Sequence, residues 1–328
     1  MKNKIKKLIE SFFSKTPKLA SIYYAVFSKA MSYEAYTTLN GKKKFHSENT
    51  GAISVLRRNI HRLEKGMIMI PRRDVFALDY IESTVDAYIF CKKKAKDTDT
   101  IQWASDVLNE YFNIVSKDDF LERQYAKFKE SSIGVSCEGN HPFLRGKVNT
   151  PVNYNELYKL SEIRRSVRWY QNKKVPHEAI DKAIELAKLS PSACNRQPYK
   201  MKIFSNANDV KEIASLPAGT TGFNHNFPMI IAFVGQLRNY YSEADRHIIY
   251  IDTSLFAMSF VLALESLGLS SCIINWPEDV VAERKANEKL KLDKDERIIF
   301  FMSVGYADED KLIPYSGKKS IEELREYH

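Results

Sequence analysis

The pattern of apolar residues changes character once along the chain, and this change limits the possible architectures more than any other feature. Before about residue 130, apolar residues recur with the 3.6-residue period of helices. After about residue 154, short apolar runs alternate with helical patterns, and a stretch rich in glycine and proline separates the two regions. We therefore predict three segments: an α-helical N-terminal domain of unknown role (1–130), a linker (131–153) and an α/β domain (154–328).

Three helices are predicted within residues 51–130 from this period. The first runs from Ile53 to Met67, the second from Val75 to about Ile89, and the third from about Ile101 to Val115. Within the first, His61 and Glu64 lie three residues apart, but no second pair of metal ligands follows at a usable spacing. A surface ion pair is therefore predicted there, and no metal site.

The second half of the chain alternates strands with helices. Apolar runs predict four strands, at Lys200–Phe204, Met229–Val234, Ser271–Asn275 and Ile298–Val304. Nearly continuous apolar strands indicate an α/β or α+β sheet that is covered on both faces. The helix Ile248–Leu267 is apolar on nearly all sides, so we expect it to be buried on every face, within one subunit or against a second copy.

Composition places the protein in the globular class. The chain has 328 residues, of which 44% are hydrophobic and 28% charged. No apolar stretch reaches the length of about 18 residues that a membrane span needs, and no secretory signal is recognised. The four cysteines show neither disulfide nor metal-ligand spacing, so reduced thiols and a cytoplasmic location are expected.

The net charge of +9 is concentrated at the N-terminus. Residues 1–50 hold ten lysines and three glutamates, which gives +7. No nucleic-acid-binding motif accompanies these lysines, so no nucleic-acid partner is expected. Ile5, Leu8 and Phe12 fall on one helical face among the lysines. Such a helix either docks its apolar face on its own domain or makes weak contact with an anionic membrane surface.

Two polar stretches in the second half carry the candidate chemistry. The first, residues 164–170, reads Arg-Arg-Ser-Val-Arg-Trp-Tyr, and the second, residues 190–199, reads Ser-Pro-Ser-Ala-Cys-Asn-Arg-Gln-Pro-Tyr. Guanidinium groups bind phosphate oxygens bidentately, and a serine hydroxyl adds a donor, so the first stretch suits a phosphate dianion. A solvated basic face is the competing interpretation. The second is a polar loop that can offer amides to a flat heteroaromatic ring.

Together these stretches resemble the signature of the nitroreductase family of FMN-dependent oxidoreductases, and the resemblance covers about residues 154–328. The resemblance implies a mixed, mainly antiparallel sheet wrapped by helices, and a homodimer with FMN at the interface. It assigns the phosphate, the ribityl chain and the flavin edge to the first stretch, the ring to the second, and the surroundings of flavin N5 and the phosphate to two later segments. The residues concerned are Arg164, Arg165, Ser166 and Arg168; Pro191, Ser192, Ala193, Asn195 and Gln197; Ile273, Ile274 and Asn275; and Lys318 and Lys319.

The function expected from the resemblance is electron transfer from NAD(P)H through flavin N5 to a small electron-poor acceptor. Nitroaromatics, quinones and unsaturated metabolites all qualify, and the chemistry is borne by the flavin without a separate catalytic residue. Two alternatives stay open: a dedicated flavin dehydrogenase whose helical domain presents a modified or macromolecular substrate, and a non-catalytic flavin-binding module. The sequence leaves open the choice between NADH and NADPH, and whether Cys194 or His225 touches substrate.

Overall fold

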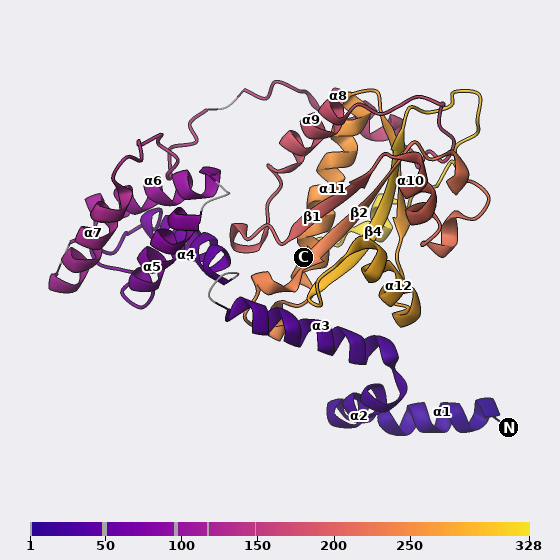
Figure 1. The fold of residues 1–328 in the computed structure, drawn as a ribbon, viewed down its shortest axis with the longest axis horizontal. Helices are drawn as coiled ribbons and strands as arrows, with labels where there is room; N and C mark the ends of the chain where they lie inside the picture. The colour runs from indigo at the N-terminus through magenta and orange to yellow at the C-terminus, as the bar shows by residue number, and fades with distance from the viewer. Residues whose placement is uncertain (1, 48–50, 95–97, 117, 148) are drawn as a thin grey trace.

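The computed structural model describes every residue except 1, 48–50, 95–97, 117 and 148. A helical N-terminal part precedes a part that contains a four-stranded sheet (Figure 1). The N-terminal helices are α1 (Lys2–Phe13), α2 (Pro17–Phe27), α3 (Lys29–Phe45), α4 (Gly51–Met67), α5 (Ile81–Lys94), α6 (Thr98–Ile114) and α7 (Asp119–Ser132). The later helices are α8 (Tyr154–Ile163), α9 (His177–Ala187), α10 (Ala207–Ala214), α11 (Ile248–Ser266), α12 (Val280–Leu290) and α13 (Ile321–Leu324).

Helices α4 to α7 share one hydrophobic core. Leu56 and Ile60 of α4, Tyr88 of α5 and Phe112 of α6 are fully buried in it. The second helix of this group starts later than the periodicity predicts, because residues 71–80 are not helical. Ala77 adopts the left-handed conformation with φ of 67°, which an α-helix does not tolerate.

The four strands form one antiparallel sheet in the order β1-β2-β4-β3, and its antiparallel pairing agrees with the mainly antiparallel sheet that the resemblance implies. The strands are β1 (Tyr199–Phe204), β2 (Met229–Gln236), β3 (Ser270–Asn275) and β4 (Glu296–Gly305). Side chains of β2 alternate between the two faces: Ile231 and Phe233 enter one core, and Ile230 and Val234 enter the other. Helices α9 and α11 cover the first face, and α10 and α12 cover the second.

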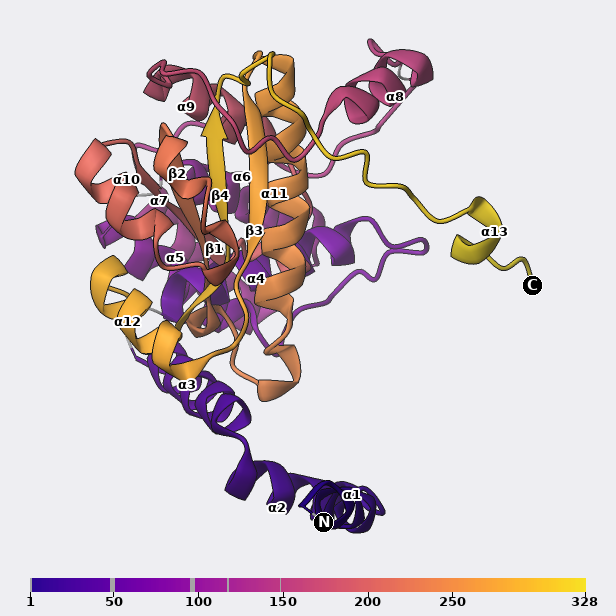
Figure 2. The ribbon, with the colours of Figure 1, turned by 90° about the vertical axis from the view of Figure 1, so that its right-hand side faces the viewer.

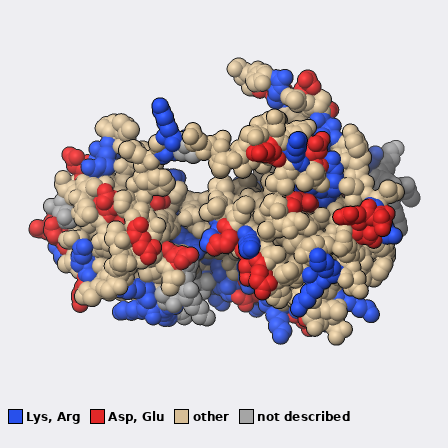
Figure 3. Space-filling model, turned by 90° about the horizontal axis from the view of Figure 1, so that it is seen from above, with Lys and Arg blue, Asp and Glu red and all other residues tan. Residues whose placement is uncertain are grey.

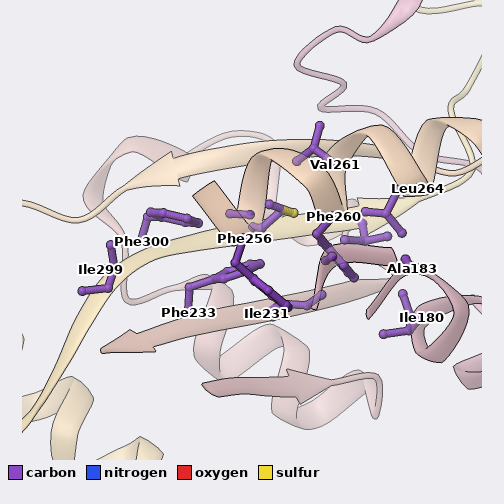
Figure 4. Packing of buried hydrophobic residues seen from close by; sticks show 14 of the residues in the cluster. Ile180, Ala183, Ile231, Phe233, Phe256, Phe260, Val261, Leu264, Ile299 and Phe300 are labelled. Carbon is purple, nitrogen blue, oxygen red and sulfur yellow. The ribbon is translucent and has the colours of Figure 1, made fainter. Parts of the chain in front are cut away.

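The core between α11 and the sheet is built from aromatic and aliphatic side chains (Figure 4). Phe256 and Phe260 of α11 point toward Phe233 of β2, and their ring centroids lie 6.3 and 6.0 Å from the Phe233 ring. Ile180 and Ala183 of α9 close the same core. This packing holds α11 against one face of the sheet.

The expectation that α11 is buried on every face is wrong for the single chain. Ile251, Leu255 and Met258 form an apolar stripe whose side chains are 52%, 44% and 46% exposed. By length and composition alone, Glu243–Ser266 is the one candidate membrane span among the described residues. Half of its most apolar window is buried inside the protein.

Helix α3 packs on the sheet-containing part of the molecule. Its Lys44 forms ion pairs with Asp293 at 2.7 Å and with the buried Asp295 at 2.9 Å. Gly41 makes the approach possible, because a Cβ there would lie 2.6 Å from Cβ of Leu237. The N-terminal segment thus reaches the sheet without passing through the α4–α7 core.

Charged side chains of both signs are interspersed over the face seen from above (Figure 3). Two lobes are visible in that view, corresponding to the α4–α7 group and the sheet-containing part. The described residues on this face form no large patch of basic side chains, although the chain as a whole carries a positive net charge.

Candidate functional site

The arginine-rich stretch runs in extended form along the edge of the sheet. Ser166 forms a parallel bridge with Ser271 of β3, and the Val167 amide donates a hydrogen bond to the Ser271 carbonyl at 3.1 Å. Tyr170 then bridges to Ala307 beyond β4, and its buried hydroxyl donates to the Val167 carbonyl at 2.7 Å. The sheet therefore holds the backbone of the stretch at both ends.

Three half-buried arginines, Arg164, Arg165 and Arg168, lie on this stretch. No described acidic side chain forms a salt bridge with Arg164, Arg165 or Arg168. Arg165 donates to the Arg164 carbonyl at 3.2 Å, and Arg168 donates to the Ser166 carbonyl at 3.3 Å. Their remaining donors can bind an anion with two or more oxygens, as a phosphate requires.

Glu265, near the end of α11, is an acidic group whose carboxyl is influenced by the Arg164 charge. Burial raises the pKa of its carboxyl from 4.5 to about 7, and the Arg164 charge opposes this rise. One of its oxygens, Oε1, is buried without a hydrogen-bond partner. Burial thus favours the neutral form of Glu265 more than water does, and this weakens its compensation of the Arg164 charge.

The third predicted segment, on β3, lies directly beside the arginine-rich stretch. Cys272 is buried, and burial raises the pKa of its thiol while Arg168 and Ser166 oppose the rise. Ile274 points into the core between the sheet and α12, whereas Ile273 is 48% exposed and Asn275 is exposed. Ile273 and Asn275 are therefore the accessible side chains of this segment.

The second stretch forms a tight loop around the 3₁₀ helix η1 (Ala193–Asn195) with an unusual backbone. Cys194, Asn195 and Gln197 all adopt the left-handed conformation, with φ of 52°, 51° and 51°. Such conformations cost about 1 kcal/mol or more each for residues with a Cβ, and they persist where surrounding contacts enforce them. Local bonds do so here: the Gln197 amide donates to Ser192 Oγ at 3.2 Å, and its side-chain amide donates to Asn195 Oδ1 at 3.0 Å.

Two residues that sequence reasoning missed also hold this loop. Asp252, buried within α11, accepts a hydrogen bond from the Ala193 amide at 3.0 Å. Arg57 of α4 donates to the Arg196 carbonyl at 3.3 Å and to Thr100 Oγ1 at 2.9 Å. An acid within the apolar first half of α11 was a signal for Asp252, but nothing local in the sequence pointed to Arg57.

The two stretches are associated with different parts of α11. The loop contacts α11 at Asp252 and, through the Ser190 hydroxyl, at Ser259 Oγ at 2.7 Å. Arg164 interacts with Glu265, thirteen residues beyond Asp252. At 1.5 Å per residue, Asp252 and Glu265 are separated by about 20 Å along the helix axis. The α11 residue that binds the Ala193 end of the loop is thus well separated from Glu265, whereas Ser190 contacts the helix at Ser259, nearer to Glu265.

The remaining candidates are more exposed. Lys318 and Lys319 lie in the exposed tail that runs out from the sheet to α13 (Figure 2). The His225 ring packs edge-on against Trp169, with centroids 5.8 Å apart, next to the arginine-rich stretch. Cys194 is a half-buried free thiol within the loop. His61 and Glu64 lie 3.6 Å apart on α4, and both are far from the two stretches in the sequence.

An antiparallel sheet wrapped by helices is the arrangement the resemblance implies, and the arginine-rich stretch lies at the edge of this sheet. Residues 162–306 match the model of the Nitroreductase family, which confirms the predicted resemblance over that range.

Among curated proteins, iodotyrosine deiodinase 1 of Sus scrofa is 23% identical over 203 residues, covering 52% of this chain and 67% of that protein. A putative NADH dehydrogenase/NAD(P)H nitroreductase of Methanothermobacter thermautotrophicus is 26% identical over 125 residues, covering 38% of this chain and 63% of that protein. The chain thus spans about two thirds of the length of these curated relatives.

Solved structures with a related chain include a nitroreductase family protein from Streptococcus pneumoniae. It is 26% identical, with a TM-score of 0.46, and the match covers 52% of this chain and 100% of that one. An FMN-dependent nitroreductase from Clostridium difficile is 24% identical, with a TM-score of 0.42, and the match covers 48% of this chain and 91% of that one.

Proposed function

We propose that the protein is an FMN-dependent oxidoreductase that passes electrons from NAD(P)H to a small electron-poor acceptor. The observation that carries the proposal is the group of three half-buried arginines without carboxylate partners, at the position of the family motif. Positive charges carried close together on one stretch repel one another, and a bound anion relieves that repulsion. The phosphate of FMN supplies the matching charge.

In this proposal Arg164, Arg165 and Ser166 bind the phosphate and the adjoining ribityl chain. Bound FMN would supply reversible two-electron chemistry at N5, between NAD(P)H and the acceptor. Arg168 would lie near the N1–C2=O edge, where reduced flavin carries negative charge. A fixed cation within about 4 Å stabilises such a charge by about 1–4 kcal/mol, depending on the local dielectric.

The loop would line the flavin ring and β3 would approach its N5 edge. Pro191, Ser192, Ala193, Asn195 and Gln197 belong to the loop, and Ile273, Ile274 and Asn275 to the strand. The left-handed backbone of the loop supports a binding role, since strained conformations cluster at ligand sites. Lys318 and Lys319 would reach the phosphate by folding of the C-terminal tail.

We further propose that two copies of the chain complete each FMN site. The separation of about 20 Å along α11 between Asp252, which binds the Ala193 amide, and Glu265, which senses the Arg164 charge, supports this. The exposed stripe of Ile251, Leu255 and Met258 supports it as well, since a second copy of α11 would cover that stripe. Each site would then take its arginines from one chain and its loop from the other.

The acceptor class is a small electron-poor molecule, such as a nitroaromatic, a quinone or an unsaturated metabolite. The deiodinase relatives act, by name, on an iodinated tyrosine, which adds halogenated aromatics to the candidates. A second candidate function is a dedicated flavin enzyme whose α4–α7 group presents one modified or macromolecular substrate. The contact between Arg57 of α4 and the loop favours it, because it ties the helical group to the ring-lining segment.

Anaerobic stopped-flow absorbance tests the proposal. The FMN-loaded protein is mixed with NADH or with NADPH, and the flavin absorbance is followed, after which candidate acceptors are added. We expect one nucleotide to bleach the flavin and an acceptor to restore its absorbance. Bound FMN that neither nucleotide reduces would contradict the reductase and favour the non-catalytic module. Failure of the protein to bind FMN at all would contradict the assignment of the site.

A further inference from the structure

The hairpin formed by α1 and α2 has an exposed apolar face. One expectation from the sequence was that this face packs on the rest of the chain, but in the structure it does not. Ile5, Leu8 and Phe12 of α1 are 53%, 67% and 52% exposed, and they lie on one side of the helix. Helix α1 packs against α2, where the rings of Phe13 and Tyr23 lie 5.5 Å apart. Figures 1 and 2 show both helices standing clear of the body of the molecule, joined to it through α3.

Positive charge surrounds this apolar face. Lys6, Lys7, Lys15 and Lys18 are exposed on the hairpin, and Glu10 is the one acidic residue of the described hairpin. Lys6 lies 3.8 Å from Glu10, so the remaining lysines have no acidic partner within the hairpin. A second copy of the hairpin would bring the same charges and be repelled, whereas an anionic surface complements them.

A basic cavity of about 710 Å³ adjoins the hairpin between α2, α3 and α12. Lys29, Arg284 and Lys294 line it, and no described residue forms a salt bridge with any of the three. Its one acidic lining residue, Asp293, is already paired with Lys44 at 2.7 Å and with Arg238 at 2.8 Å. Ala25 and Val26 of α2 give the cavity an apolar rim.

We propose that the α1–α2 hairpin and this cavity dock the protein on an anionic lipid bilayer. Amphipathic helices with basic flanks lie in the membrane interface, with their apolar side buried at the level of the acyl chains. The Leu8 and Phe12 side chains would enter that layer, the lysines would meet the headgroups, and the cavity would take a headgroup phosphate. The exposed apolar stripe of α11 belongs to neither the hairpin nor the cavity. Docking through the hairpin and the cavity therefore leaves the stripe free to pack against a second copy of the chain.

Flotation of the full chain with lipid vesicles tests the proposal. One set of vesicles contains phosphatidylcholine alone, and the other also contains phosphatidylglycerol. We expect binding to the anionic vesicles, little binding to the neutral ones, and weakening by added salt. Thermal unfolding midpoints check that each variant below is folded.

Three paired substitutions identify the contacts. Lys6→Glu with Lys7→Glu should weaken binding about thirtyfold or more, since each basic side chain near an anionic surface contributes a factor of about five. Leu8→Glu with Phe12→Glu should abolish binding, and Arg284→Glu with Lys294→Glu should weaken it. The matched control is Lys93→Glu with Lys211→Glu, which makes the same charge change at exposed positions of α5 and α10.

Two kinds of result would overturn the proposal. One is a parent protein that does not float with anionic vesicles. If, in addition, Leu8→Glu with Phe12→Glu removes a self-association of the parent, the apolar face pairs with a second copy of the chain and not with lipid. The other is a control pair that weakens binding as much as Lys6→Glu with Lys7→Glu, because the attraction would then depend only on net charge. Binding that follows the hairpin and cavity substitutions supports the docking surface.

Discussion

Arg164 and Arg168 differ from the well-buried arginines of the described chain in their partners. Arg196 pairs with Asp245 at 3.2 Å, and Arg297 pairs with Glu278 at 3.0 Å. A buried arginine normally needs such a carboxylate, because removal of its charge from water is costly. Arg164 and Arg168 are only half-buried, and no described carboxylate forms a salt bridge with either, so their charges are available to an anionic ligand.

Arg164→Ala should weaken FMN binding about tenfold to a hundredfold, since a charge-assisted hydrogen bond contributes about 1.5–3 kcal/mol. Arg168→Ala should weaken it too, and should also lower the two-electron potential because the reduced flavin loses its neighbouring cation. FMN fluorescence titration and dye equilibration measure the two quantities. Lys7→Ala on the N-terminal hairpin is the control and should change neither. Two arginine variants that hold FMN as tightly as the parent would place the site elsewhere.

Glu265 predicts a pH dependence of stability. The pKa of its carboxyl is raised in the fold from 4.5 to about 7. The contribution of this group to the free energy of unfolding is therefore fully present below about pH 4.5 and is lost as the pH rises through 7. Glu265→Gln stays neutral, so its stability relative to the parent should rise between pH 5 and pH 8 by about 1–2 kcal/mol, after allowance for partial exposure. Urea unfolding at the two pH values measures this. Glu162→Gln, at an exposed position, is the control, and equal behaviour of the two variants would refute the assignment.

At the scale of elements, the contact between α4 and the ring-lining loop joins the helical group to the candidate site. Arg57→Ala should loosen the loop and raise the FMN dissociation rate about tenfold, because the Arg196 carbonyl loses a charged donor. Arg57→Lys should restore part of the effect. The neighbouring Arg58, which lies over the Tyr241 ring, supplies the control Arg58→Ala. If Arg57→Ala and Arg58→Ala release FMN at the parent rate, α4 plays no part in the site.

The elements themselves were largely predictable from the sequence, because their apolar runs are continuous and strongly patterned. The strand predicted over Met229–Val234 is β2, and the helix predicted over Ile248–Leu267 is α11. Val75 and Leu78 misled the prediction, since periodicity cannot reveal the left-handed turn at Ala77. The arginine-rich stretch and the loop were recognised by motif, but Arg57 and the distance between the two stretches depend on tertiary packing that no local pattern records.

At the scale of the whole molecule, the boundary over residues 131–153 stays a prediction. Hydrogen bonds from the Gln102 side chain to the Ser136 carbonyl, and from the Asn140 amide to Asp106, tie the first part of this segment to α6. Phe143 and Leu144 beyond it are 87% and 96% exposed. Brief chymotrypsin digestion should therefore cut at these two residues first, as mass spectrometry of the fragments would show. A chain that is first cut elsewhere would weigh against this boundary.

The central claim is that each FMN site combines the arginines of one chain with the loop of another. One variant carries Arg164→Ala and Arg168→Ala, and the other carries Asn195→Ala and Gln197→Ala. Each alone should form a dimer that retains little FMN. A mixed dimer would contain one site in which both halves are unaltered and one in which both are altered.

The decisive measurement is the FMN content of the mixed dimer, purified through a different affinity tag on each variant. The shared site predicts that FMN binding returns at close to the parent affinity, with one FMN per mixed dimer. A site built within a single chain predicts no recovery, since every chain carries an altered half. A mixed dimer that binds FMN as poorly as its two parents would contradict the account.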